Sequence, residues 1–140
     1  MSAIALLLVV LLYPIETTVV PIWKIRVIDE HGTGYEGIRI VEFWKHYSLE
    51  LQDGENGEER WTDGSGVVEF PRRTIRLSIL SRLARTSITG LLRYLHGSTG
   101  IHAYVMATGP QGIKDLNYDP KKPPPETLVL PRYETQDGNQ

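Results

Sequence analysis

Polar and apolar residues alternate along much of the chain, as they do in half-buried β-strands. In the segment 22–29, Trp23, Ile25 and Val27 share one face, and charged residues lie on the other. Similar runs recur at short intervals. They predict strands at residues 22–29, 37–48, 67–71, 74–79, 102–108 and 127–130. Strands at this spacing, joined by glycine-containing turns, predict an all-β protein with the architecture of a β-sandwich.

Glycine-rich turns separate the predicted strands. Asp63-Gly64-Ser65-Gly66 stands between two β-prone runs, so we expect a hairpin there. Asp63 also offers an oxygen ligand for calcium, but a complete calcium loop needs further carboxylates at fixed intervals. We therefore interpret the segment as a plain turn and expect no metal ion and no other cofactor.

One segment departs from the β pattern. From Leu80 to Leu95, apolar residues recur at helical spacing. Polar residues gather on the opposite side, and three of them are basic: Arg82, Arg85 and Arg93. The pattern predicts one amphipathic helical insertion at about residues 80–95.

The predicted helix has two possible placements. Its apolar face could close one end of the sandwich and leave the arginines in water. Alternatively, its basic face could lie on an anionic membrane surface. We favour the first placement, because an exposed apolar stripe is unfavourable for a soluble domain. Either way, the basic face is a candidate binding surface.

The N-terminal residues are apolar and uncharged. Ala3 to Tyr13 is a run of eleven apolar residues closed by Pro14. A transmembrane helix needs about 20 such residues, whereas the apolar region of a signal peptide is this short. We interpret residues 1–20 as a signal peptide or a membrane-associating leader, with a buried first element of the domain as the alternative. Residues 21–133 then form the domain, and residues 134–140 a disordered tail.

Composition and charge narrow the possible functions. The chain has 140 residues, which fits one domain, and no Cys, which excludes disulfides and thiolate metal sites. Its net charge is -2, but residues 71–113 contain six Arg and no Asp or Glu. We expect no binding to nucleic acid, because no aromatic residue apart from Tyr94 lies among these arginines.

Three motifs follow one another in the first half of the domain. They are Val27-x-Asp29-x-x-Gly32, then Gly37-Ile38-x-Ile40, then Thr62-Asp63-Gly64-Ser65-Gly66 with Val68-x-Phe70. Their order resembles the carboxypeptidase regulatory-like domain family, well over residues 23–70 and loosely elsewhere. The resemblance implies a Greek-key β-sandwich of transthyretin-like or immunoglobulin-like type, related to collagen-adhesin B modules, and a non-catalytic scaffold or binding role. The chain departs from the family at Gly34-Tyr35-Glu36, which replaces a small residue and a proline, and in its added helix.

Catalytic candidates are few. No His has a Glu three positions later, as zinc carboxypeptidases with this module require, and the chain does not end in the Tyr-Arg-Gly-Ser tetrapeptide of hydroxyisourate hydrolases. His96 and His102 flank Gly97-Ser98-Thr99-Gly100 and could meet a Ser in a hydrolytic arrangement. Nothing in the sequence places a base beside a nucleophile. We predict no catalytic residues, with a small hydrolase using these two histidines as an alternative.

The remaining candidates concern binding. Trp23, Trp44 and Trp61 could form an aromatic platform for sugar or peptide, although their place in β runs favours packing. We expect a non-catalytic structural or binding module of an exported (periplasmic or extracellular) or membrane-associated, bacterial protein. Its partner would be a protein, a glycan or an anionic lipid surface. A membrane-surface protein held by the leader and the basic helix is the alternative.

Overall fold

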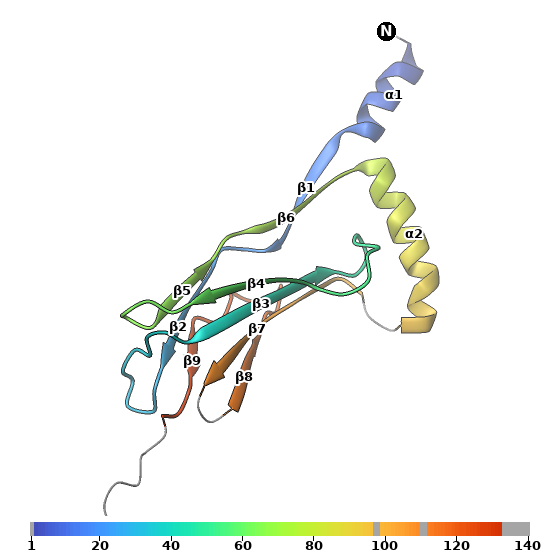
Figure 1. Ribbon diagram of the computed structural model, residues 1–140. Helices are drawn as coiled ribbons and strands as arrows, with labels where there is room; N and C mark the ends of the chain where they lie inside the picture. The colour runs from blue at the N-terminus through green and yellow to red at the C-terminus, as the bar shows by residue number, and fades with distance from the viewer. Residues whose placement is uncertain (1, 97–98, 110–111, 133–140) are drawn as a thin grey trace, which may run out of the picture.

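The computed structural model describes residues 2–96, 99–109 and 112–132, without the side chains of residues 92–96. Over these ranges the protein is mostly β, with three sheets and two helices, and it fits a β-sandwich (Figure 1). In chain order the elements are α1 (Ala3–Leu12), β1 (Pro14–Val20), β2 (Trp23–Ile28), β3 (Arg39–His46), β4 (Asn56–Trp61), β5 (Val67–Phe70), β6 (Arg73–Ser78), α2 (Ile79–His96), β7 (Ile101–Gly109), β8 (Gly112–Asn117) and β9 (Thr127–Val129). All the strands expected from the sequence are present, β4 includes the β-prone run expected before residues 63–66, and β1 and β8 are additional.

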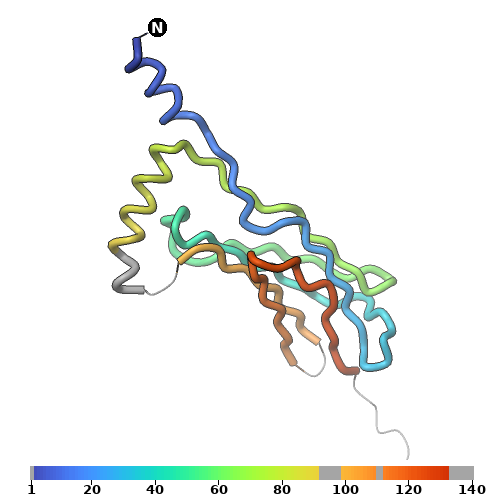
Figure 2. The backbone as a smooth tube through the Cα atoms, turned by 180° about the vertical axis from the view of Figure 1, so that it is seen from behind, coloured from blue at the N-terminus to red at the C-terminus, as the bar shows by residue number. Residues whose placement is uncertain are grey.

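A long two-stranded ribbon runs along the molecule and is interrupted by proline. β1 pairs antiparallel with β6, and β2 pairs antiparallel with β5. Pro21 and Pro71 lie between these two ladders, one on each side of the ribbon. Because proline has no N–H to donate, one proline on each strand divides the ribbon into separate sheets. The part of the β1–β6 ladder next to the helices projects beyond the body (Figures 1 and 2).

The core lies between the sheet β5-β2-β9 and the larger sheet β4-β3-β7-β8. The alternation in β2 has the predicted effect, because Trp23, Ile25 and Val27 are fully buried. Apolar residues of β3, β5, β7 and β9 complete the core. They are Ile40, Val68, Phe70, Ala103, Val105, Ala107 and Leu128, with Ile38 and Leu130 just outside the strands.

The first half of the ribbon belongs to the same packed body. Val19 and Val20, at the end of β1, are buried in the core. Residues 14–20, assigned to the leader from the sequence, form β1 and are paired with β6. The domain boundary expected after residue 20 stays a prediction. Cleavage or membrane association of the leader stays a prediction. The tail expected at residues 134–140 lies outside the described ranges.

The turn at residues 63–66 joins two sheets. Asp63 Oδ1 accepts hydrogen bonds from the backbone N–H groups of Ser65 and Val67, each at 2.9 Å. This local chemistry confirms the expected turn. The expected hairpin is wrong, because β4 belongs to the larger sheet and β5 pairs with β2. Turn residues fix the local reversal of the chain, but they do not determine which sheet receives the next strand.

The other motif residues hold the same junction together. Thr62 Oγ1 donates to the carbonyl of Tyr35 at 2.6 Å and accepts from the N–H of Ile38 at 2.9 Å. Gly66 has a φ of 77°, and a Cβ there would collide with the carbonyl oxygen of Val27. Only glycine combines this φ with such a close approach of two backbones. These motif residues therefore have structural roles.

Candidate functional site

Helix α1 is apolar on every side and stands away from the core. Ser2 caps its start by accepting a hydrogen bond from the N–H of Ala5 at 3.3 Å, and Pro14 begins β1 directly after it. Its large side chains are between 48% and 71% exposed. They are Ile4, Leu6, Leu7, Leu8, Val9, Val10 and Leu12. An apolar helix with this much exposed surface indicates a contact with an apolar environment.

Helix α2 directs its apolar face into solvent. Leu80, Leu83, Ile88 and Leu91 are 51%, 59%, 49% and 78% exposed. The expectation that this face closes the end of the sandwich is therefore wrong. The helix has the predicted position and the predicted amphipathic pattern, but the opposite orientation.

The polar face of α2 explains this orientation. The Arg82 guanidinium donates to Thr17 Oγ1 at 2.6 Å and to the carbonyl groups of Ile15 and Leu77. The Arg85 guanidinium donates to the carbonyl of Leu49 at 2.8 Å. A guanidinium carries five N–H donors, so it satisfies several carbonyl groups at the ends of strands and in loops. Both arginines of the described basic face thus bind the protein itself.

The third predicted arginine, Arg93, has its side chain outside the described residues, as does His96. The structure therefore places Arg82 and Arg85 against β1, β6 and the loop after β3, and says nothing of Arg93. The candidate surface shifts from the basic face of α2 to its apolar face.

The two helices lie at the same end of the molecule and contact each other (Figures 1 and 2). We call the exposed apolar residues of α1, together with Leu80, Leu83, Ile88 and Leu91, the apolar surface. Residues 2–15 carry no charge, and the only charged residues of α2 are arginines. In the described part of the chain, neither helix is both long enough and apolar enough to cross a membrane.

A cluster of rings lies on the outer face of the larger sheet. The register pairs Phe43 with Tyr104 and Lys45 with His102. The rings of Phe43 and Tyr104 are stacked, with centroids 5.0 Å apart, and His102 lies 5.4 Å from Tyr104. Tyr47 follows, 6.1 Å from His102. We call Phe43, Tyr104, His102 and Tyr47 the ring cluster.

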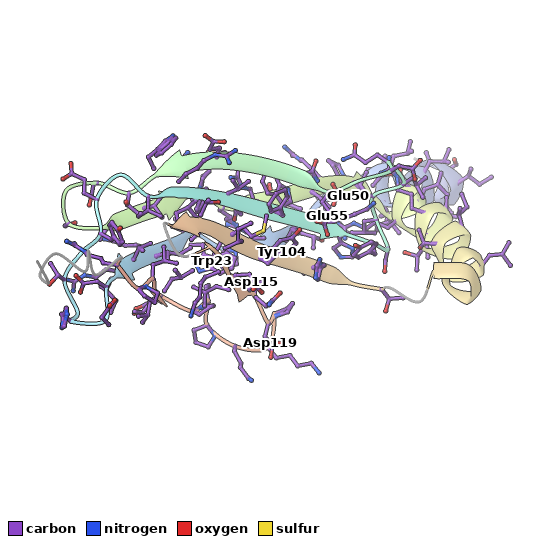
Figure 3. All side chains as sticks on the ribbon, turned by 60° about the horizontal axis from the view of Figure 1, so that its bottom comes forward. Trp23, Glu50, Glu55, Tyr104, Asp115 and Asp119 are labelled. Carbon is purple, nitrogen blue, oxygen red and sulfur yellow. The ribbon has the colours of Figure 1, made fainter. Side chains whose placement is uncertain are left out.

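Glu55 joins the polar groups of the ring cluster. Its Oε2 accepts from the Tyr104 hydroxyl at 2.9 Å, and its Oε1 lies 3.0 Å from His102 Nδ1 and 3.4 Å from the Tyr47 hydroxyl. In the tautomer that carries its proton on Nδ1, His102 donates to Glu55. Burial and the neighbouring Glu55 raise the pKa of both tyrosines, which keeps the phenols protonated as donors. Figure 3 shows Glu55 near the α2 end of the sheet and Tyr104 further along it.

The three tryptophans are not arranged as one platform. Trp23 is fully buried and donates from Nε1 to the carbonyl of Pro125 at 2.7 Å. Trp44 packs beneath the Arg73 guanidinium, 4.0 Å from the ring centroid. Trp61 is 59% exposed at the end of β4. The packing alternative thus describes Trp23 and Trp44, while Trp61 is free to contact solvent.

An open pocket of about 440 Å³ lies between Arg85 of α2, the loop after β3, and β6. Its lining residues are Glu50, Leu51, Gln52, Thr74, Ile75 and Arg85. The charged groups in its wall are engaged: Glu50 accepts from the N–H of His46, and Arg85 donates to Leu49. Among the described residues, no three His, Asp or Glu side chains are placed to hold a metal ion.

Sequence reasoning found α2 but not the ring cluster. No motif connects Phe43, Glu55 and Tyr104, which are brought together by strand register. Alternating aromatic residues at 43 and 47 and at 102 and 104 were the only signal. The chain matches no family model. Comparisons with curated proteins and with solved structures likewise give no significant match.

Proposed function

We propose that the protein is a non-catalytic β-sandwich module held at a lipid bilayer by α1 and by the apolar face of α2. The observation that carries this proposal is the apolar surface, in which two adjoining helices expose leucine, isoleucine and valine side chains. Fully burying one such side chain is worth about 1.5–3 kcal/mol. Many half-exposed side chains at one end of a molecule therefore provide a substantial driving force for insertion.

The length of α1 suits entry into one leaflet. Its ten residues give a helix of about 15 Å, against a hydrocarbon thickness of about 30 Å. The amphipathic α2 would lie in the interface, with its apolar face toward the acyl chains. Hydrogen bonds from Arg82 and Arg85 to the body would keep that face outward.

This proposal differs from a basic helix on an anionic surface. The guanidinium groups of Arg82 and Arg85 are engaged by the protein, so the attraction would be mainly apolar. Salt screens charge interactions and does not weaken apolar insertion. We therefore expect binding to neutral vesicles as well as to anionic ones.

Further parts of the proposal concern fold and location. We propose the Greek-key, transthyretin-like arrangement of carboxypeptidase regulatory-like domains. What supports it is that the three motifs lie at the junction between the sheets, where Thr62 and Gly66 have structural roles. We also propose that the protein is exported or membrane-associated, and the support is the apolar α1.

The test is co-sedimentation of the full chain with vesicles of phosphatidylcholine, alone or mixed with phosphatidylglycerol, at low and high salt. We expect sedimentation with both, little changed by salt. The double variant Leu83→Glu, Leu91→Glu should lower binding at least about tenfold, which corresponds to about 1.4 kcal/mol. The matched control is Ile113→Glu, because Ile113 is 64% exposed on β8, far along the chain from both helices.

Three results would contradict the proposal. They are no sedimentation with either vesicle, equal losses in the α2 variant and the Ile113 control, and binding that disappears in high salt. Sedimentation velocity without lipid provides a further check. A stable dimer that the α2 substitutions dissociate, in a chain that ignores vesicles, would assign the apolar surface to a second copy.

A further inference from the structure

We propose that the outer face of the larger sheet binds a neutral saccharide, with the ring cluster as the stacking surface and Glu55 as a hydrogen-bond acceptor. This site is separate from the apolar surface, and the inference does not depend on membrane binding. Four observations support it: the spacing of the rings, the fixed position and remaining acceptor sites of Glu55, the uncovered side of the Phe43 ring, and the charges near the ring cluster.

The rings form a continuous apolar row. The centroid distances from Phe43 to Tyr104, to His102 and to Tyr47 are 5.0, 5.4 and 6.1 Å in succession. All four rings are partly exposed, and His102 is the most exposed of them. A sugar ring has a face of C–H groups that packs on such rings and a rim of hydroxyl groups. Aromatic side chains with a few fixed polar groups are the usual composition of a small-molecule site.

Glu55 is held in position and still has acceptor capacity. Its carboxylate accepts from two phenols and one imidazole, and the side chain remains 24% exposed. Two carboxylate oxygens offer about four lone-pair sites, so at least one remains for a ligand hydroxyl. Because three protein donors fix its orientation, binding would require little reordering of this side chain.

The side of Phe43 next to β4 is kept open by glycine. Gly57 is the residue of β4 that faces Phe43 in the register. A Cβ at Gly57 would stand 3.5 Å from two carbons of the Phe43 ring and would cover part of it. Any other residue at this position would therefore reduce the stacking surface.

The charges around the ring cluster favour a neutral ligand. Glu55 brings one negative charge, and Lys45 brings one positive charge, with its ammonium group 5.1 Å from the Tyr47 ring centroid. Lys45 is 9% exposed and donates to the carbonyl of Gln52 at 2.9 Å. Across the sheet, Asp115 faces Met106 in the register, and Glu59 is paired with Arg39. Glu55 and Asp115 add negative charge near the rings, which disfavours a phosphate-rich ligand, whereas the charge of Glu59 is neutralised by Arg39.

The test is a titration of the full chain, followed by NMR and by isothermal titration calorimetry, with cellohexaose, chitohexaose and maltohexaose as separate probes. We expect at least one probe to bind and to shift the amide signals of β3 and β7 around the ring cluster. Tyr104→Ala should lower the affinity at least about tenfold. Tyr104→Phe, which keeps the ring and removes only the hydroxyl, should lower it less.

Two controls keep the test decisive. Trp61→Ala removes an exposed aromatic residue outside the ring cluster and should leave affinity unchanged. If Tyr104→Ala unfolds the sheet, His102→Ala replaces it, because the His102 side chain is 48% exposed and its loss spares the core. The proposal is overturned if none of the three saccharides binds, if Trp61→Ala abolishes binding while Tyr104→Ala does not, or if only a cationic probe, hexa-arginine, binds at the ring cluster.

Discussion

At the scale of single residues, Arg73 contacts two carboxylates and a tryptophan ring. Its guanidinium lies 2.6 Å from Glu42 and 2.6 Å from Glu58, and it covers the Trp44 ring. Glu42 is fully buried, and its Oε1 lacks a hydrogen-bond partner among the described residues. Burial raises the pKa of Glu42 above 4.5, and Arg73 offsets only part of that effect. The hydrogen bond from Arg60, aided by Arg73, lowers the pKa of Glu58.

These shifts predict the pH dependence of a variant, Arg73→Met. Above the raised pKa of Glu42, the variant leaves an ionised carboxylate buried without its cation, which costs about 3–5 kcal/mol. Below that pKa, Glu42 is neutral and the loss is smaller. Urea unfolding across pH should therefore show a stability difference from the wild type that grows as pH rises through the raised pKa of Glu42.

The control for this prediction lies on the same strand. Arg76 is exposed on β6, and Arg76→Met should change the free energy of unfolding by no more than about 0.5 kcal/mol at any pH. A loss in Arg73→Met that is the same at acidic and neutral pH would contradict the role given to Glu42.

Two glycine positions allow the free-energy cost of backbone strain to be distinguished from that of steric overlap. Gly54 and Gly66 both have positive φ, 82° and 77°. A Cβ on Gly54 meets open space, whereas a Cβ on Gly66 would lie 2.6 Å from the backbone nitrogen of Tyr35. Gly54→Ala should cost about 1–2 kcal/mol from its φ alone, and Gly66→Ala should cost clearly more. Equal losses in chemical denaturation would show that the two backbones at Gly66 can separate freely.

At the scale of elements, α2 is attached by a few polar contacts beside an open pocket. Arg82 binds the ribbon, Arg85 binds the loop after β3, and Arg85 also lines the pocket of about 440 Å³. A helix attached in this way should open locally without global unfolding.

Arg82→Met tests this attachment. Hydrogen exchange should accelerate at least about tenfold in the α2 amides and stay unchanged in β2, β3 and β7. Thr86→Ala is the matched control, because Thr86 is exposed on the same helix. Acceleration spread evenly over the core would instead show that Arg82 supports the whole fold.

The same element shows what the sequence could and could not predict. The period of α2 depends on its own residues, and so the helix was predictable. Its orientation depends on the carbonyl groups of Ile15, Leu77 and Leu49, which the sequence does not reveal as a surface. The edge strand β8 escaped prediction, and only the end of β4 was expected, because both strands are mostly exposed and lack a clear alternating pattern. Charged residues such as those of β4 protect an edge from pairing with another chain.

The buried face of the sheet and the ring cluster differ in the same way in how far the sequence predicts them. The buried face of β2 could be predicted, since alternation alone determines it. The ring cluster could not, because Glu55 comes from a loop and reaches Tyr104 across the sheet only after β3 and β7 have paired. The period of a strand indicates which of its faces is buried, but it does not indicate how that strand is aligned with strands that are distant in the sequence.

At the scale of the whole molecule, the two proposed surfaces lie on different parts of one elongated chain. The apolar surface lies on the two helices, and the ring cluster lies on the outer face of the larger sheet, with Glu55 toward its α2 end (Figures 1 and 3). Thr89 of α2 donates to the carbonyl of Ser48, the residue after Tyr47 of the ring cluster. A module with this arrangement would present a saccharide beside the lipid surface on which it rests.

Pro21 and Pro71 mark the place where the ribbon changes from one ladder to the next. Within the described ribbon, ladder pairing stops on one side of Pro21 and Pro71 and resumes on the other. The ribbon can therefore change direction there without losing ladder hydrogen bonds. Because Val19, Val20 and Arg73 pack against the body just beyond this break, the bend is fixed, and it would set the direction from which the lipid meets the sheet.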